Sequence, residues 1–133
     1  YIDEVACDFP KLTIIIGHAG KIWHTETAML LRKHKNIYTD ISTNIGRDSE
    51  FSEHPMLWLL YKIKSYAGCL NRVFFGSDYP LYMQDETLTC INSAIKLLNK
   101  RYDGFISDKD IEGIMFKNAS NLINRIKNNS KIG

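Results

Sequence analysis

The stretch LTIIIGHAG, residues 12–20, decides the fold, because its apolar run stops abruptly at a glycine and a histidine. Two later stretches have the same design, IYTDIS at residues 37–42 and VFFGSDYP at residues 73–80. Their β-branched and aromatic residues do not alternate strictly with polar ones, which is typical of strands covered on both faces, as in a parallel sheet. We therefore predict strands at residues 12–16, 37–41 and 73–75.

Helical patterns lie between and after the predicted strands, with apolar residues recurring at helical spacing. Thr25 is expected to cap the first helix, and Pro55 suits the first turn of the second. The first helix is expected to bury Met29, Leu30 and Leu31. The predicted helices span residues 25–34, 55–67 and 85–102.

Two further helices are predicted to close the fold at its C-terminal end. Ser107, with Asp110 three residues on, resembles a capping box and opens a short helix through Met115. Asn118 is expected to cap a last helix, which is followed by a frayed tail at residues 128–133. The residues that this last helix is expected to bury are Leu122, Ile123 and Ile126.

The predicted order is therefore β-α-β-α-β-α-α-α, with helical sequence ahead of the first strand. Strands that alternate with helices indicate parallel strands joined by right-handed crossovers. No linker, repeat or low-complexity tract divides the chain, so residues 1–133 are expected to form a single domain. A (β/α)8 barrel takes about 250 residues, and the chain is about half as long. Because the outer strands of a three-stranded sheet present unpaired backbone groups, the sequence predicts an α/β half-barrel that needs a partner.

Composition excludes several classes of protein. The 133 residues carry a formal net charge of +2, with 44% hydrophobic and 24% charged residues, which is typical of a globular domain and too mild to imply a nucleic-acid partner. No run approaches the roughly 18 apolar residues of a membrane span, and the N-terminus does not resemble a signal peptide. Three cysteines far apart in the sequence fit neither a disulfide framework nor a zinc knuckle. We expect a cytoplasmic protein with no membrane partner.

Polar residues lie at the end of each predicted strand, where ligands bind in parallel α/β folds. They are His18 after the first strand, Asp40 and Ser42 at the second, and Asp78 after the third. His18 and Asp78 are 60 residues apart, about two βα units, so we expect their side chains to face one pocket. Each also fits a plainer role, His18 as a partner of backbone groups and Asp78 as a turn-former ahead of Tyr79.

The remaining candidates have weaker support. His24, His34 and His54 share no metal-ligand spacing, and we interpret them as structural or surface residues. Trp23 and Tyr82 stand just past two strand ends, but they fit ordinary packing better than a substrate pocket. Neither group adds a residue to the candidate site.

Taken together, the strand-end motifs resemble the amidohydrolase superfamily, specifically the amidohydrolase-2 group of metal-dependent (β/α)8 enzymes that includes aminocarboxymuconate-semialdehyde decarboxylase. FPKLTIIIGHAG resembles the sixth strand of that barrel, KNIYTDIS the seventh and NRVFFGSDYP the eighth. ISDKDIEGIMFKNASNLI resembles its closing helices, including the pair Asn118-Ala119. The resemblance covers nearly the whole chain and implies the C-terminal part of a (β/α)8 barrel, strands six to eight plus the closing helices.

The resemblance implies roles for two residues. Asp78 matches the acid after the eighth strand, which in this family binds a divalent metal and can take a proton from the attacking water. His18 matches the sixth-strand histidine, which lies beside the metal and handles a proton. The metal is expected to be zinc, with manganese as the alternative. The family's His-x-His after its first strand and its histidine after the fifth have no counterpart here, and Lys21 stands where the family has a second glycine after GHAG.

The sequence thus predicts a metal-dependent hydrolase or decarboxylase that acts on a small carboxylated or cyclic organic substrate, with Asp78 as metal ligand and His18 as proton relay. Phosphoester hydrolysis shares the barrel and the metal but fits the near-neutral charge less well. The alternative is a catalytically silent half-barrel, because this chain supplies only one clear metal ligand. In that case we expect it to pack against itself or against its missing N-terminal half, as a homo-oligomer in solution.

Overall fold

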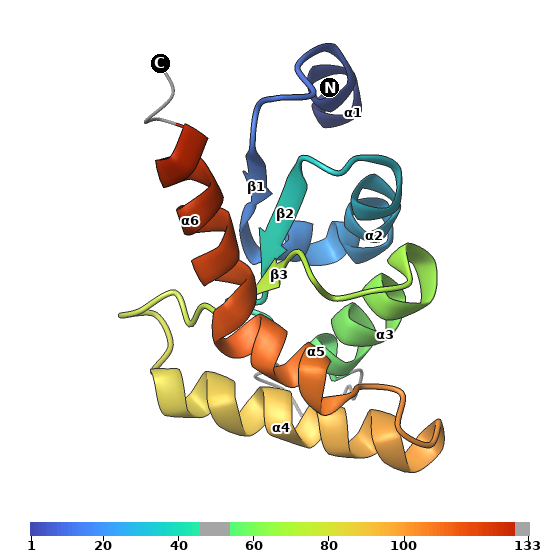
Figure 1. The fold of residues 1–133 in the computed structure, drawn as a ribbon. Helices are drawn as coiled ribbons and strands as arrows, with labels where there is room; N and C mark the ends of the chain where they lie inside the picture. The colour runs from blue at the N-terminus through green and yellow to red at the C-terminus, as the bar shows by residue number, and fades with distance from the viewer. Residues whose placement is uncertain (46–53, 130–133) are drawn as a thin grey trace.

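The computed structural model describes residues 1–45 and 54–129, a chain in which short strands alternate with helices (Figure 1). All three predicted strands are present, each shorter than predicted. Besides the α-helices, the structure has one 3-10 segment and one π-helical segment among the described residues. None of the helices so described combines the length and the apolar character of a membrane span. In chain order the elements are α1 (Ile2–Asp8), β1 (Ile14–Ile16), η1 (Gly17–Trp23), α2 (His24–Lys33), β2 (Ile37–Asp40), α3 (Pro55–Ala67), β3 (Val73–Phe74), α4 (Gln84–Arg101), α5 (Asp108–Glu112), η2 (Gly113–Lys117) and α6 (Asn118–Asn129).

The three strands form one parallel sheet in the order β1-β2-β3. Ile14 of β1 pairs with Ile37 of β2, and Thr39 of β2 pairs with Val73 of β3. Parallel strands with intervening helices confirm the predicted α/β class, and they bring the carboxyl ends of all three strands to one edge of the sheet. The half-barrel itself stays a prediction, because the described part of the chain holds only these three strands.

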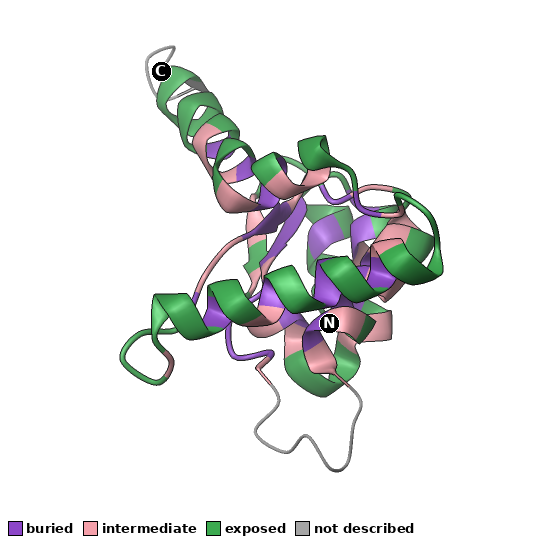
Figure 2. Ribbon diagram, turned by 90° about the horizontal axis from the view of Figure 1, so that it is seen from below, coloured by how far each residue is buried: buried purple, intermediate pink, exposed green. Residues whose placement is uncertain are grey.

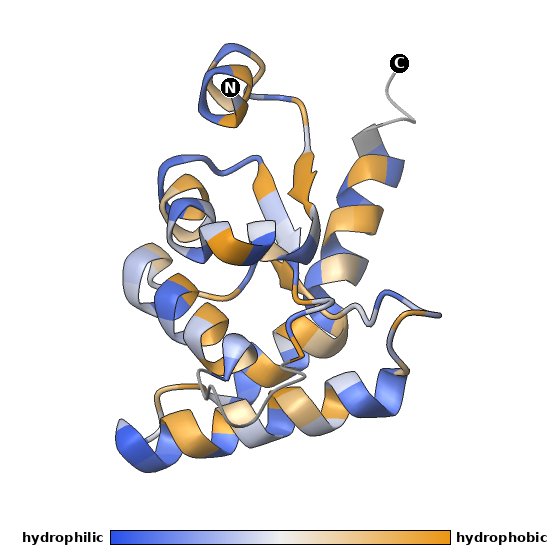
Figure 3. Cartoon of the chain, turned by 180° about the vertical axis from the view of Figure 1, so that it is seen from behind, coloured by the Kyte–Doolittle hydropathy of each residue, from blue (hydrophilic) through white to orange (hydrophobic). Residues whose placement is uncertain are grey.

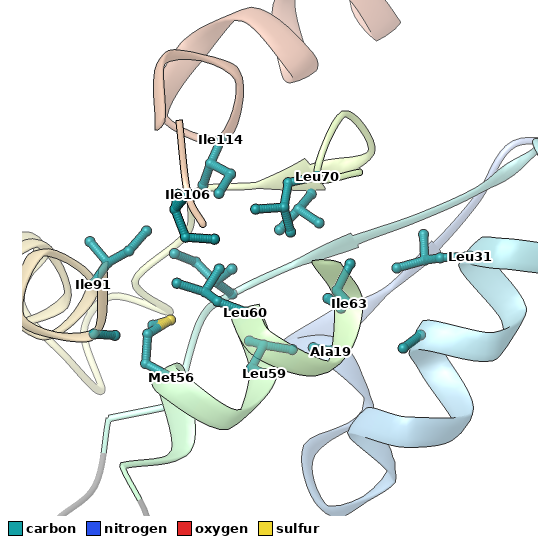
Figure 4. Close-up of a cluster of buried hydrophobic side chains, with 14 of the residues drawn as sticks. Ala19, Leu31, Met56, Leu59, Leu60, Ile63, Leu70, Ile91, Ile106 and Ile114 are labelled. Carbon is teal, nitrogen blue, oxygen red and sulfur yellow. The ribbon is translucent and has the colours of Figure 1, made fainter. Parts of the chain in front are cut away.

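The main hydrophobic core lies between one face of the sheet and helices α2, α3 and α4. Leu59, Leu60 and Ile63 of α3 are fully buried, and Figure 4 shows them between Ile91 of α4 and Leu31 of α2. These α3 residues recur at helical spacing, so the periodicity seen in the sequence is what buries them. Figure 2 shows the buried residues gathered where the helices meet the sheet, with exposed residues on their outer sides.

Helix α6 covers part of the opposite face of the sheet and lies beside the strands in Figure 3. Tyr38 of β2 and Phe74 of β3 stack there with ring centroids 5.5 Å apart, and Leu122 of α6 is buried with them. The guanidinium of Arg125 lies 5.5 Å from the centre of the Tyr38 ring. Ile15, the register partner of Tyr38 on this face, is 54% exposed. The sheet is therefore well covered on one face and only partly covered on the other.

The segments α5, η2 and α6 form one continuous helical run. Ser107 caps α5 as predicted, because its hydroxyl accepts from the backbone N–H of Asp110, whose carboxylate accepts from the N–H of Ser107. Asn118 does not cap a helix, contrary to the prediction, since it lies inside the run with helical backbone angles. Its buried amide instead donates to the carbonyls of Leu70 and Val73, each at 2.8 Å. The prediction was wrong because these partners lie 45 or more residues away in the sequence.

Some smaller predictions were also wrong. Helix α2 begins at His24 rather than after a capping Thr25, and no side chain caps it. The predicted tail at residues 128–133 is helical at its first two positions, and the rest lies outside the described residues. The residues expected to be buried but found exposed are Met29, Ile123 and Ile126.

Candidate functional site

The turn after β1 places His18 at the carboxyl edge of the sheet. The backbone has positive φ at four successive residues, with values of 58° at His18, 51° at Ala19, 70° at Gly20 and 53° at Lys21. Such backbone costs about 1–2 kcal/mol for each residue that has a Cβ, so surrounding contacts must hold it in place. A Cβ at Gly20 would lie only 2.7 Å from the Oγ1 of Thr27. The turn therefore requires glycine at this position.

Asp40, at the end of β2, holds this turn through its carboxylate. Its two oxygens lie 3.2 and 3.3 Å from the backbone nitrogen of His18, which donates. The Oδ1 atom also accepts from the backbone N–H of Ser42 at 2.9 Å and from the Ser42 hydroxyl. The Oγ of Ser42 in turn lies 2.7 Å from the Nδ1 of His18. One carboxylate thus fixes the backbone of His18 and, through Ser42, its ring.

Asn44 extends this network to a second histidine. Its Nδ2 lies 3.1 Å from the carbonyl oxygen of His18 and 2.8 Å from that of Ser42. Its Oδ1 lies 2.8 Å from the Nε2 of His24. Burial lowers the pKa of His24, and the bond to Asn44 opposes that shift only in part, so the neutral form of the ring is favoured. His24 is therefore a structural residue, as interpreted from the sequence, that supports the surroundings of His18.

Asp78 lies beyond the neighbouring strand end, and its side chain is exposed. The loop after β3 passes the network at Gly76, where a Cβ would lie 3.7 Å from the Oδ1 of Asp40. Asp78 follows with a φ of 67°, and its carbonyl accepts from the N–H of Leu81, as a turn-former does. Within the part of the chain that the structure describes, no hydrogen bond or ion pair joins Asp78 to His18. That these two side chains face one pocket stays a prediction.

At this edge of the sheet, Asp78 is the residue predicted to bind a divalent metal, and His18 is predicted to lie beside that metal. The carboxylate of Asp40 already accepts several hydrogen bonds. A catalytic zinc takes three protein ligands and a water. Across residues 1–45 and 54–129, no group of three His, Cys, Asp or Glu side chains is placed to hold a metal ion. The residues that the structure describes therefore do not complete a metal centre by themselves.

The two remaining histidines lie outside the network. His34 is buried, and its Nε2 lies 2.6 Å from the carboxylate of Asp3, which ties α1 to the end of α2. This contact confirms a structural role for His34. Burial lowers the pKa of His54, whose Nδ1 finds no hydrogen-bond partner among the described residues.

The sequence singles out Asp40 and Ser42 as strand-end residues but gives neither a role, and it gives no hint of Asn44. A signal for the first two was present, because Ser42 follows Asp40 by only two residues at the end of the predicted strand. Asn44 carried no such signal. Its partners are brought within reach only by the local backbone, where Thr43 has a φ of 55°.

Comparison with family models gives a match over most of the chain. A model described as amidohydrolase matches residues 1–125. Searches of curated proteins and of solved structures found no match. The matched range includes every residue of the network around His18.

Proposed function

The chain belongs to the amidohydrolase family, and on that basis we propose that it is the C-terminal part of a (β/α)8 barrel enzyme of the amidohydrolase-2 type. The enzyme is a metal-dependent hydrolase or decarboxylase, similar to aminocarboxymuconate-semialdehyde decarboxylase, that acts on a small carboxylated or cyclic organic molecule in the cytoplasm. Family membership supports a hydrolase or lyase activity and a divalent metal. The three-stranded parallel sheet with its helices is compatible with part of such a barrel.

The observation that carries this proposal is the arrangement around His18. Barrel enzymes place their active sites at the carboxyl edge of the strands, and His18 lies at that edge. Its backbone and its Nδ1 are held by Asp40 and Ser42, while its side chain remains 39% exposed. An imidazole held in this way is suited to handle a proton.

Asp78 is the proposed metal ligand and a base for the attacking water. A divalent metal bound there would lower the pKa of a bound water to about 7, which would supply hydroxide near neutral pH. Zinc is the expected metal, with manganese as the alternative. Because no group of three His, Cys, Asp or Glu side chains among the described residues is placed to hold a metal ion, the site needs further ligands from residues outside them.

Replacing the proposed metal ligand tests the assignment. In the intact gene product, Asp78→Asn is expected to weaken Zn²⁺ binding about tenfold or more, since even the partners that orient metal ligands are worth 10–100-fold in affinity. Titration calorimetry on metal-free protein, with Zn²⁺ and then Mn²⁺, measures this.

Asp85→Asn is the matched control, because Asp85 is an exposed acid in the first turn of α4. It is expected to bind Zn²⁺ as the unaltered protein does. Unchanged affinity and unchanged turnover in Asp78→Asn would end the assignment of Asp78.

A second candidate is a catalytically silent half-barrel that packs against itself or against an N-terminal half. The lack of three metal-ligating side chains in any one place within the described ranges favours it. The edge strand β1 favours it as well, because an open strand edge tends to pair with another chain. In this case the chain alone shows no turnover, binds no metal tightly and forms a homo-oligomer in solution.

A further inference from the structure

The hydrogens shared by Asp40, Ser42 and His18 can be assigned from the chemistry of the three groups. An aspartate carboxylate only accepts hydrogen bonds, a serine hydroxyl has one hydrogen to donate, and a neutral imidazole has one N–H and one bare nitrogen. The hydroxyl of Ser42 contacts the Oδ1 of Asp40 on one side and lies 2.7 Å from the Nδ1 of His18 on the other. Two contacts therefore compete for one hydroxyl hydrogen.

That hydrogen lies between Ser42 and Asp40. If it pointed to His18, the Oγ of Ser42 and the Oδ1 of Asp40 would be in contact through lone pairs alone, and that contact would be repulsive. Asp40 is held in place by the backbone N–H groups of His18 and Ser42, so its carboxylate is not free to turn away. Once its hydrogen is committed to Asp40, the Oγ of Ser42 can only accept toward the ring. The Nδ1 of His18 must therefore carry the hydrogen.

We infer that Asp40 and Ser42 are positioning residues that hold His18 in the tautomer with its hydrogen on Nδ1 and a bare Nε2. The inference rests on the proposed function, since a bare Nε2 has consequences only where His18 takes part in chemistry. In this tautomer Nε2 is the nitrogen that can take a proton from water or substrate, or bind a metal. A neutral His18 with its hydrogen on Nε2 could do neither at that atom.

The same network holds His24 in the opposite tautomer. The Nδ2 of Asn44 faces the backbone carbonyls of His18 and Ser42, so the Oδ1 of Asn44 is the atom that faces His24. An amide oxygen only accepts, so the Nε2 of His24, 2.8 Å away, carries the hydrogen. The tautomer of His24 depends on Asn44 rather than on Asp40 or Ser42. It therefore serves as a reference inside the same protein.

Nitrogen NMR distinguishes the two tautomers. The full chain is labelled with ¹⁵N-histidine and studied without metal at pH 8, above the ordinary pKa range of histidine. Two-bond proton–nitrogen correlations then identify which nitrogen of each ring carries a hydrogen. The expected result is a hydrogen on Nδ1 of His18 and on Nε2 of His24. A hydrogen on Nε2 of His18, alone or together with one on Nδ1, overturns the inference.

Three variants separate positioning from a merely structural role. Ser42→Ala removes only the hydroxyl, and it is expected to abolish the fixed Nδ1–H state of His18, so that the ring returns to the Nε2–H preference of free histidine. Asp40→Ala frees the hydrogen of Ser42 for Nδ1 and is expected to give the same result. Asp40→Asn is the conservative rescue, because its amide oxygen can replace Oδ1 and keep the hydrogen on Nδ1. His24 keeps its Nε2–H in all three variants.

A Ser42→Ala protein in which His18 stays wholly in the Nδ1–H state would show that the inference is wrong. Should Asp40→Ala fail to fold after losing its backbone contacts, Ser42→Ala and Asp40→Asn still decide the question. None of these measurements uses turnover or bound metal. The inference can therefore fail while the assignment of Asp78 stands, and the assignment of Asp78 can fail while the inference stands.

Discussion

Lys21 has a backbone conformation that suits glycine. Its φ of 53° and ψ of −114° lie in a region that residues with a Cβ rarely adopt, and the residue is exposed. The resemblance to amidohydrolases places a glycine at this position. This chain therefore carries backbone strain, next to His18, that a glycine would avoid.

Lys21→Gly is expected to raise the free energy of unfolding by about 1 kcal/mol, because relief of left-handed backbone strain exceeds the entropic cost of glycine. Urea denaturation followed by circular dichroism measures the change. Lys35→Gly is the control, since Lys35 is also exposed but is not among the residues with positive φ, and it is expected to lose stability. Equal losses in the two variants would mean that the backbone at Lys21 is unstrained.

At the scale of elements, the helical run from α5 to α6 is attached to the sheet through Asn118. Its buried amide donates to the carbonyl of Leu70, which precedes β3, and to that of Val73, the first residue of β3. The carbonyl of Ile114, in η2, accepts from the N–H of Phe75 just past β3 at 2.9 Å. The run thus covers the outer side of β3, where a further strand would otherwise pair.

Asn118→Ala is expected to lower the free energy of unfolding by about 2 kcal/mol, because two buried carbonyls lose their donor. Asn121→Ala, one turn further along α6 at an exposed position, is expected to change it by less than about 0.5 kcal/mol. Urea denaturation of both variants under the same conditions measures the difference. Similar values for the two would mean that the amide of Asn118 does not hold the run to the sheet.

Local signals predicted the elements, and the distant contacts that join them could not be predicted from one sequence. Ser107 and Asp110 are three residues apart, so their capping box was visible in the sequence. Asn118 looked like a cap because its partners, 45 and 48 residues away, leave no local trace. The bond between Ser42 and His18 spans 24 residues in the same way. Strand order placed His18 near β2, but only the side-chain geometry assigned its partners.

At the scale of the whole molecule, the sheet has one face that α6 covers only in part. Tyr38 and Phe74 are buried under Leu122, whereas Ile15 on the edge strand β1 remains 54% exposed on the same face. Edge strands with exposed apolar side chains tend to pair with another chain. We therefore expect the chain alone to self-associate through β1.

Sedimentation velocity over a range of concentrations is expected to show a dimer or a larger species. Ile15→Lys places a charge on the edge strand without touching the core and is expected to shift the chain toward monomer. Leu97→Lys, at a 46% exposed position on α4, is the control and is expected to leave the association unchanged. If the unaltered chain sediments as a monomer at every concentration, self-association is contradicted.

The hydrogen bonds that hold the rings of His18 and His24 have a consequence that depends on which ring nitrogens form them. Both histidines of the network are anchored through ring N–H groups, Nδ1–H of His18 to Ser42 and Nε2–H of His24 to Asn44. These N–H groups exist in the neutral and in the charged imidazole alike, because protonation adds a hydrogen to the other nitrogen. A proton can therefore arrive at His18 and depart again with every anchoring bond intact, so each catalytic cycle would begin and end with the same geometry.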